Sequence, residues 1–322
     1  MDGRAGAARI SCSRASCSSS FSPWWLARSR PASTCSGCDG RIVSYWADKN
    51  VLVTGASSGL GLATAELVAA AGAHVALVAR DEVRLEAARE AVSARCATGS
   101  QRVLSYACDV SDRSAVDDVV GRVTAELGPV DVLAACAGFC EPRRFVETPV
   151  EEFQRHLDVN LLGSVYAAKA VVPSMIERGS GHIGLVSSMG GLVGVYGYSA
   201  YSAAKFGVTG LAEVLRSELR PHGVGVTLLC PPNMDTPGYA REVATEPRET
   251  AAINGIAKTI DPSEVARQFV RDIERGRFLV LHGMSNRLLY RIEGVWPELF
   301  YRLFDGKVAA ARREGVRSDA AH

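Results

Sequence analysis

The chain of 322 residues carries 36 basic and 35 acidic side chains, and 47% of its residues are apolar. This composition is ordinary for a globular protein with one large core or two smaller ones, and a net charge of +1 argues against nucleic acid or a strongly acidic partner. Nine cysteines occur without regular spacing and predict no disulfide framework, and the pair Cys35 and Cys38 lacks a second ligand pair for a metal.

The first 46 residues are expected to be disordered. They are rich in Ser, Arg, Ala and Gly, contain few acidic residues, and show neither helical nor strand periodicity. No apolar run of signal-peptide length occurs, because Pro23 breaks the segment FSPWWLA (21–27) and Arg28 follows it. Two interpretations stay open: an Arg/Ser-rich organelle transit segment, and a start codon assigned too far upstream, which we favour.

The first strand, turn and helix predict a dinucleotide-binding site. Residues 49–54 form a short apolar strand that runs directly into GASSGLG (55–61), and an alanine-rich helix follows over 62–72. Glycines in this context permit a tight turn and a close backbone approach to a pyrophosphate, which the helix N-terminus then faces. The cofactor-binding residues predicted in this turn are Gly55, Ser57, Ser58, Gly59, Leu60 and Gly61.

A second strand, over residues 74–79, indicates which form of the cofactor is bound. It ends in Arg80, about twenty residues beyond the glycines, where NAD-binding proteins place an acid for the ribose 2′-hydroxyl. Ala79 removes that acid and Arg80 supplies a cation that suits a 2′-phosphate, although a solvated loop arginine is the alternative. We therefore predict NADP(H) as the cofactor, with Arg80 among its binding residues.

The alternation of strands and helices continues. Helices are expected over 82–95 and 113–127, and strands over 102–107 and 130–135. Such alternation with short turns predicts the α/β class, with a doubly wound parallel sheet flanked by helices. Asp109, just after a strand, is placed to accept a hydrogen bond from an adenine amine, and Ser111 or Asp112 is placed to cap the next helix.

The candidate catalytic residues lie in the segment 187–205. The apolar run IGLVSS (183–188) predicts a buried strand that ends at Ser188. Tyr201 and Lys205 are four residues apart and share one face of a helix. The lysine ammonium is expected to lower the pKa of Tyr201 from its usual value of about 10, so that the phenol exchanges a proton with a substrate oxygen that Ser188 also holds.

Residues 179–204 contain no Lys, Arg, Asp or Glu, which is the pattern that a hydropathy scan flags as a membrane span. The segment is too rich in Gly, Ser and Tyr for a span, and it contains the candidate catalytic residues. We expect no transmembrane segment in this chain.

The order and spacing of these motifs resemble the short-chain dehydrogenase/reductase family. The motifs that carry the resemblance are TGASSGLG (54–61), Asp109-Val110, Asn160, Ser188 and YSAAK (201–205). The resemblance implies one Rossmann-type domain over 47–285. It implies that Tyr201 donates a proton, that Lys205 lowers the pKa of Tyr201 and binds the nicotinamide ribose, and that Ser188 polarises the carbonyl.

The same resemblance implies that Asn160 holds a water molecule of a proton relay, for which polar packing inside a helix is the alternative. The further cofactor-binding residues that it implies are Asp109, Val110, Ala137, Gly138, Tyr201, Lys205, Pro231 and Thr236. One segment departs from the family pattern, since ACAG (135–138) replaces the usual Asn-Asn-Ala-Gly. The side-chain bonds that brace this strand are then absent, which puts cofactor affinity rather than chemistry in doubt.

A narrower resemblance points to the substrate. The segments CPPNMDTPG (230–238), LVGVYGY (192–198) and PSEVA (262–266) are similar to 3-ketodihydrosphingosine reductases, which implies reduction of a long-chain 3-keto sphingoid base with NADPH. The same machinery acting on another lipid, steroid or aliphatic alcohol or ketone is the alternative. A non-catalytic NADP-sensing module is a further alternative, against which the intact catalytic set argues.

The substrate is expected to lie against residues 189–198 and 231–260, which present an apolar wall. The wall residues are Met189, Tyr196, Tyr198, Met234 and Tyr239. Beyond a strand over 278–281, residues 286–322 form an amphipathic tail with Trp296, Leu299, Phe300, Leu303 and Phe304 at helical spacing. Contact with a membrane surface, a lid over the site and a dimer contact stay open as its uses. We expect a cytoplasmic homo-oligomer that binds a hydrophobic small molecule, and peripheral membrane contact through the tail stays open.

Overall fold

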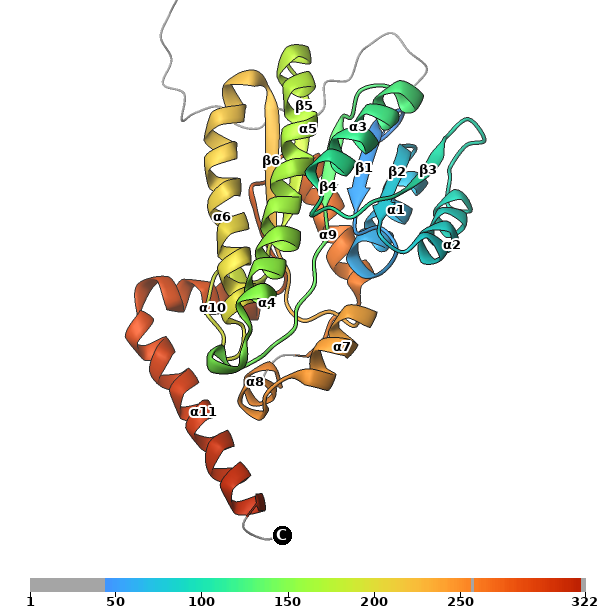
Figure 1. Cartoon of the computed structure of the whole chain (residues 1–322). Coiled ribbons are helices and arrows are strands. Elements are labelled where there is room, and N and C mark those ends of the chain that lie inside the picture. Colours follow the sequence, from blue (N-terminus) through green and yellow to red (C-terminus); the bar gives the residue numbers. More distant parts are fainter. Residues whose placement is uncertain (1–43, 256–257, 320–322) are drawn as a thin grey trace, which may run out of the picture. The chain divides into compact units, whose positions relative to one another are not determined.

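The computed structural model describes residues 44–255 and 258–319 (Figure 1). The expected disorder of residues 1–46 and the Cys35–Cys38 pair lie outside the described residues, apart from residues 44–46. Trp46 is only 2% exposed and packs with apolar side chains of the first two strands. The folded part of the chain therefore includes this tryptophan.

The centre of the fold is a parallel sheet with the strand order β3-β2-β1-β4-β5-β6-β7. The strands are β1 (Asn50–Thr54), β2 (His74–Ala79), β3 (Val103–Ala107), β4 (Val132–Ala135), β5 (Gly181–Val186), β6 (Val224–Cys230) and β7 (Leu279–Leu281). Every residue of β1 and β4 is buried, as expected for strands covered on both faces. The predicted doubly wound α/β architecture is confirmed.

Helices cover both faces of the sheet (Figure 1). One face is covered by α1 (Gly59–Ala70), α2 (Glu82–Ser93) and α9 (Pro262–Glu274), and the other by α3 (Arg113–Leu127), α5 (Gly163–Arg178) and α6 (Ser199–Leu219). Each set of helices contributes its apolar face to a separate buried cluster. Helix α3 has the bounds predicted for it, because Asp112 caps its start and Gly128 stops it.

The helix α4 (Val150–His156) continues through a π-helical turn (Leu157–Leu162) into α5. Contrary to the sequence expectation, this continuous stretch has the length and composition of a membrane span. Its apolar side, however, packs on β4, β5 and α3, and the side chains of Val171 and Met175 are buried there. The stretch is therefore accounted for as a core helix of the α/β fold.

The segment after β6 and the C-terminal segment are both helical. Residues 231–260, the expected substrate segment, contain α7 (Pro237–Thr245) and α8 (Arg248–Asn254), and the tail contains α10 (Met284–Val295) and α11 (Pro297–Asp319). Helix α11 packs against α8, the second helix after β6 (Figure 1). Trp296 and Leu303 are each 62% exposed, whereas Phe304 packs on the core, and the side chains of Leu299 and Phe300 lie outside the described residues.

Candidate active site

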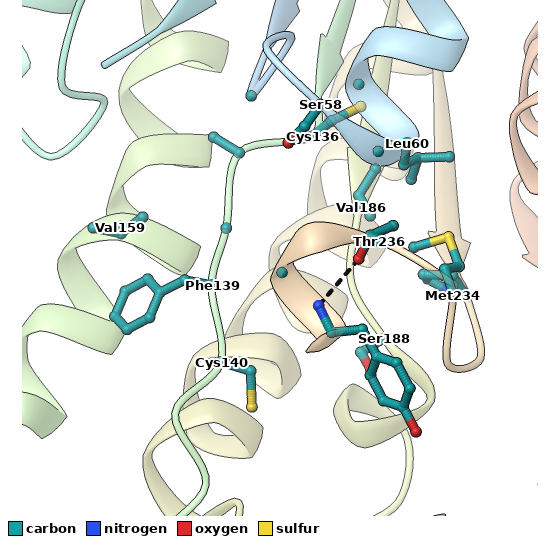
Figure 2. Close-up of a pocket in the computed structure, with 18 of the residues that line it drawn as sticks. Ser58, Leu60, Cys136, Phe139, Cys140, Val159, Val186, Ser188, Met234 and Thr236 are labelled. Atoms are coloured by element: carbon teal, nitrogen blue, oxygen red, sulfur yellow. Dashed lines mark hydrogen bonds between the residues drawn. The ribbon is translucent and has the colours of Figure 1, made fainter. Parts of the chain in front are cut away.

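A cleft of about 330 Å³ opens beyond the carboxyl ends of β1, β2, β4, β5 and β6 (Figure 2). This is the edge at which parallel α/β sheets bind their ligands. The predicted site residues that line it are Gly55, Ser57, Ser58, Gly59, Leu60, Gly61, Arg80, Val110, Ala137, Gly138, Ser188, Tyr201, Lys205, Pro231 and Thr236. Asn160 and Asp109 do not line the cleft; Asn160 is buried behind it and Asp109 lies beside Arg80.

The glycine turn brings two backbone segments into contact. Gly55 has a φ of +68°, and a Cβ atom at this position would lie 2.7 Å from the Cα of Ala137. A Cβ atom at Gly61 would lie closer to the carbonyl oxygen of Gly55 than side chains ever approach. Only glycine fits both positions, so the backbone itself forms this part of the cleft.

The start of α1 suits an anion. Ser58 is the N-cap residue, yet no side chain caps the helix, and the first turn contains no acidic residue. The exposed N–H groups and the helix dipole therefore face the cleft without a competing negative charge. The residues present fit the pyrophosphate of a dinucleotide at this place.

Two arginines, Arg80 and Arg84, lie near the C-terminal end of β2. Arg80 lies 3.7 Å from the carboxylate of Asp109, and both side chains are largely exposed. Asp109 also accepts hydrogen bonds from the backbone and hydroxyl of Ser111, at 2.9 and 2.7 Å. Arg84, which the sequence analysis did not single out, lines the same end of the cleft because Asp81 caps α2 and sets its first turn. This end of the cleft therefore presents two guanidinium groups, beside the carboxylates of Asp81 and Asp109.

The candidate catalytic residues lie on α6 and on the turn after β5. Lys205 is 4% exposed, its Nζ donates to the carbonyl of Val186 at 3.0 Å, and it lies 5.8 Å from the centroid of the Tyr201 ring. The Ser188 hydroxyl accepts a hydrogen bond from the backbone N–H of Gly190 at 3.0 Å. The shared helix face predicted for Tyr201 and Lys205 agrees with this geometry.

The direction expected for the pKa of Tyr201 was wrong for this structure. Burial raises the pKa of the phenol above its usual value, and the neighbouring Cys140 adds to the shift, whereas a hydrogen bond with Ser188 opposes it. Burial also lowers the pKa of Lys205 to about 8. Loss of hydration raises the pKa of Tyr201 by more than the Lys205 ammonium was expected to lower it. The ammonium donates to the Val186 carbonyl and is itself desolvated.

Asn160 braces the loop after β4. It is fully buried in the π-helical turn, where its Oδ1 accepts from the N–H of Phe139 at 3.0 Å and its Nδ2 donates to the carbonyl of Phe139 at 3.1 Å. The N–H of Ala137 donates to the hydroxyl of Thr54 at 3.2 Å. These bonds hold the ACAG segment, although the family's asparagine pair is absent. A Cβ atom at Gly138 would lie 2.6 Å from Oδ1 of Asn160 and 3.3 Å from Nζ of Lys205.

The far end of the cleft is less apolar than expected. Tyr198, Met234 and Tyr239 line it, but Met189 and Tyr196 do not. The Tyr198 hydroxyl donates to the carboxylate of Glu242, which also lines the cleft. Cys140 is a further lining residue that the sequence analysis missed. No spacing in the sequence indicates these contacts, since Tyr198 precedes α6, Glu242 lies on α7 and Cys140 lies in the loop after β4.

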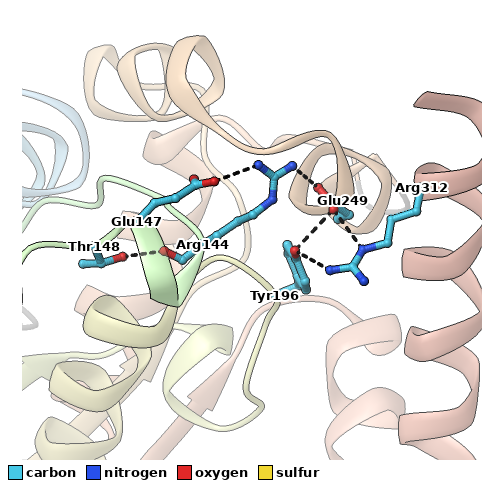
Figure 3. A network of polar contacts seen from close by, with 6 residues as sticks. All are labelled: Arg144, Glu147, Thr148, Tyr196, Glu249 and Arg312. Carbon is cyan, nitrogen blue, oxygen red and sulfur yellow. Dashed lines mark hydrogen bonds and ion pairs between the residues drawn. The ribbon is translucent and has the colours of Figure 1, made fainter. Parts of the chain in front are cut away.

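A second polar cluster ties the tail to the substrate segment (Figure 3). Glu249 on α8 has a side chain that is 5% exposed and pairs with Arg144 at 3.1 Å and with Arg312 of α11 at 3.2 Å. The Tyr196 hydroxyl donates to the same carboxylate at 3.2 Å, and Arg312 donates to that hydroxyl at 3.1 Å. One carboxylate thus joins four segments that are remote in sequence.

The comparisons with known proteins agree with this geometry. Residues 49–247 match the family model described as short chain dehydrogenase. The chain is 42% identical over 230 residues to a 3-ketodihydrosphingosine reductase of Bos taurus (71% of this chain, 69% of the relative) and 41% identical over 241 residues to a 3-dehydrosphinganine reductase of Danio rerio (74% and 73%).

Solved structures of short-chain dehydrogenases and reductases superpose on this chain. A short-chain dehydrogenase/reductase from Burkholderia phymatum in complex with NAD superposes with a TM-score of 0.71 at 25% identity, over 79% of this chain and 95% of the other. An L-sorbose reductase from Gluconobacter frateurii complexed with NADPH and L-sorbose superposes with a TM-score of 0.66 at 28% identity, over 74% and 97%.

Proposed function

Because this chain belongs to the short-chain dehydrogenase/reductase family, we propose that it is an NADP(H)-dependent reductase that converts 3-ketodihydrosphingosine to dihydrosphingosine. Family membership makes it an oxidoreductase that acts on a ketone or the corresponding alcohol. The observation that carries the proposal is the single cleft that unites the glycine turn with Ser188, Tyr201 and Lys205. The substrate comes from the relatives whose names give this activity.

The roles proposed for the catalytic residues follow from their protonation and contacts. A nicotinamide cofactor, when bound, supplies the hydride. Because burial raises the pKa of Tyr201, the phenol is protonated at neutral pH and donates its proton to the developing alkoxide. The Ser188 hydroxyl holds the same oxygen, and Lys205, whose pKa of about 8 lies near neutrality, is placed to replace the proton. Asn160 positions the loop after β4, and Gly138 of this loop lies between the side chains of Asn160 and Lys205.

The cofactor-binding roles follow from the charge along the cleft. The glycine turn and the start of α1 are proposed to hold the pyrophosphate, and Arg80 with Arg84 the 2′-phosphate, as charge-assisted contacts. Asp109 is proposed to orient Arg80 and to accept from the adenine amine. The remaining contacts are assigned to Val110, Ala137, Gly138, Pro231 and Thr236.

Peripheral contact with a membrane, a homo-oligomeric state and a cytoplasmic location are further proposals. The membrane proposal is supported by the exposed Trp296 and Leu303 beside the basic residues Arg302 and Lys307 of α11. Co-sedimentation with anionic vesicles tests it, and retention of the purified protein in the supernatant contradicts it. Analytical ultracentrifugation gives the oligomeric state.

A substrate panel tests the proposed reaction. We expect the purified protein to oxidise NADPH with 3-ketodihydrosphingosine at a higher kcat/KM than with steroid or simple aliphatic ketones, and to use NADH poorly. Tyr201→Phe should lower kcat by about 10²–10⁴-fold while leaving NADPH binding intact, because it removes the proton donor. Negligible turnover of 3-ketodihydrosphingosine beside good turnover of another ketone would end the lipid assignment, and an unchanged rate in Tyr201→Phe would end the mechanism.

A further inference from the structure

One carboxylate, Glu242, faces the substrate end of the cleft. Of the acidic side chains that line the cleft, Asp81 caps α2 at the end of β2, whereas Glu242 comes from α7, after β6. The hydroxyl of Tyr198 and the thiol of Cys140 both hydrogen-bond to Glu242. The ring of Tyr198 meets the ring of Tyr201 edge to face, with 5.6 Å between the centroids. Glu242 therefore lies close to Tyr201, whose phenol is proposed to bind the substrate carbonyl oxygen.

No cation of the described chain neutralises this carboxylate. Glu242 forms no ion pair with any lysine or arginine among residues 44–255, 258–298 and 301–313, where side chains are described. The charged group that acts on it most strongly is Glu246, one turn further along α7, which is also acidic. Burial and this repulsion raise the pKa of Glu242 to about 7, against hydrogen bonds that lower it. An unpaired, largely buried carboxylate costs free energy, which a cationic ligand would recover.

We infer that Glu242 binds an ammonium group on the carbon next to the substrate carbonyl, so that the cleft selects 2-amino ketones over plain ketones. The inference rests on the proposed function, since 3-ketodihydrosphingosine carries an amino group at this carbon. Glu242 lines the same cleft as Ser188 and Tyr201 and acts electrostatically on the Tyr201 phenol, so it is near enough to meet a group on a carbon next to a ketone held there. Arg241 and Lys205 also line the cleft, but neither forms an ion pair with Glu242, so the ammonium supplies a counter-ion that no described side chain provides.

The alternative role of Glu242 is structural, as the acceptor for the Tyr198 hydroxyl. Glu242→Gln separates the two roles, because the glutamine carbonyl still accepts that hydrogen bond while the charge is gone. Glu246→Gln is the matched control. Glu246 accepts a hydrogen bond from Asn254 at 2.7 Å and does not line the cleft.

The experiment measures kcat/KM for 3-ketodihydrosphingosine and for the same ketone with hydrogen in place of the amino group. We expect the wild-type enzyme and Glu246→Gln to prefer the amino ketone. In Glu242→Gln, kcat/KM should fall about ten- to a hundredfold for the amino ketone and change less than threefold for the plain ketone, as for the loss of one charged hydrogen bond. Thermal unfolding of each variant shows whether it is folded.

The outcomes separate the inference from the proposed function. An equal fall for both ketones, or an unchanged preference in Glu242→Gln, overturns the inference and leaves the reductase assignment standing. If the wild-type enzyme reduces other ketones but not 3-ketodihydrosphingosine, the proposed function fails. In that case dihydrosphingosine is tested as an inhibitor of the ketone that is reduced. Its inhibition constant should rise at least tenfold in Glu242→Gln, and an unchanged constant overturns the inference.

Discussion

Two glycine-to-alanine substitutions, Gly61→Ala in α1 and Gly121→Ala in α3, should have opposite effects on stability. A Cβ atom at Gly61 would run into the carbonyl oxygen of Gly55, and its next neighbours are also backbone atoms. A Cβ atom at Gly121 would meet nothing within 4 Å, and this residue is exposed. The two variants share the same chemical change and differ only in the space around it.

The magnitudes follow from two terms. Alanine in a helix interior is favoured over glycine by about 0.5–1 kcal/mol, and at Gly121 this gain should appear almost unopposed. At Gly61 overpacking against backbone costs about 1–3 kcal/mol, because backbone atoms cannot rotate away as a side chain can. We expect Gly61→Ala to lower the free energy of unfolding by about 1–2 kcal/mol. Because the clash displaces the glycine turn, this variant should also bind NADPH at least tenfold more weakly.

Urea denaturation of the three proteins, with equal m-values as the check for a common unfolding reaction, gives the free energies. Titration of NADPH by fluorescence gives the affinities. If Gly61→Ala proves as stable as the wild-type protein and binds NADPH equally well, the close approach of α1 to the glycine turn is wrong. If Gly121→Ala is destabilised, the open space assigned to the outer face of α3 is wrong.

Three further predictions concern charge. Arg80→Ala should weaken NADPH binding at least tenfold and NADH binding less than threefold by fluorescence titration, and equal losses would contradict the 2′-phosphate contact. Glu242→Gln should stabilise the free protein by about 3 kcal/mol at pH 8, because a folded pKa of about 7 against about 4.5 in the unfolded chain penalises the ionised form. This gain should shrink as the pH falls from 7 and vanish below pH 4.5, where Glu242 is protonated in the folded and in the unfolded protein. Urea denaturation at pH 8 and pH 4 measures the gain, and equal effects at the two pH values would contradict the raised pKa. Arg312→Ala should lower stability only slightly in the same measurement, because its side chain is 62% exposed and Glu249 keeps its ion pair with Arg144. Glu249→Ala should lower stability more, because it leaves both arginines without their carboxylate, and the reverse order would contradict the network.

Much of the fold was predictable because the strands are buried on both faces and read as continuous apolar runs. The run over 74–79 has the same bounds in the sequence analysis and in the structure. Helix α3 was predicted to the residue, since a capping aspartate and a Gly-Pro stop are local signals. The spacing of Tyr201 and Lys205 is likewise a local property of one helix, and their shared face follows from it.

The remainder depends on contacts that no local pattern encodes. The pKa of Tyr201 rises because the folded chain removes water around it, and burial is a property of the whole fold. The position of Glu242 in the cleft could not be predicted, because its partners, Tyr198 and Cys140, come from distant segments. The apolar wall was inferred from residue types alone, and type does not show that the Tyr198 hydroxyl points at a carboxylate.

The carboxylate of Glu249 has a practical consequence for anyone who shortens or tags the protein. A chain trimmed after Trp296 would retain every residue that lines the cleft, yet it would lose Arg312 and with it one of the charges that hold α8 in place. The activity of such a trimmed protein would report how freely the substrate segment moves, and it would say little about the reacting groups. A C-terminal affinity tag would therefore follow directly on the helix that supplies Arg312 to this ion pair.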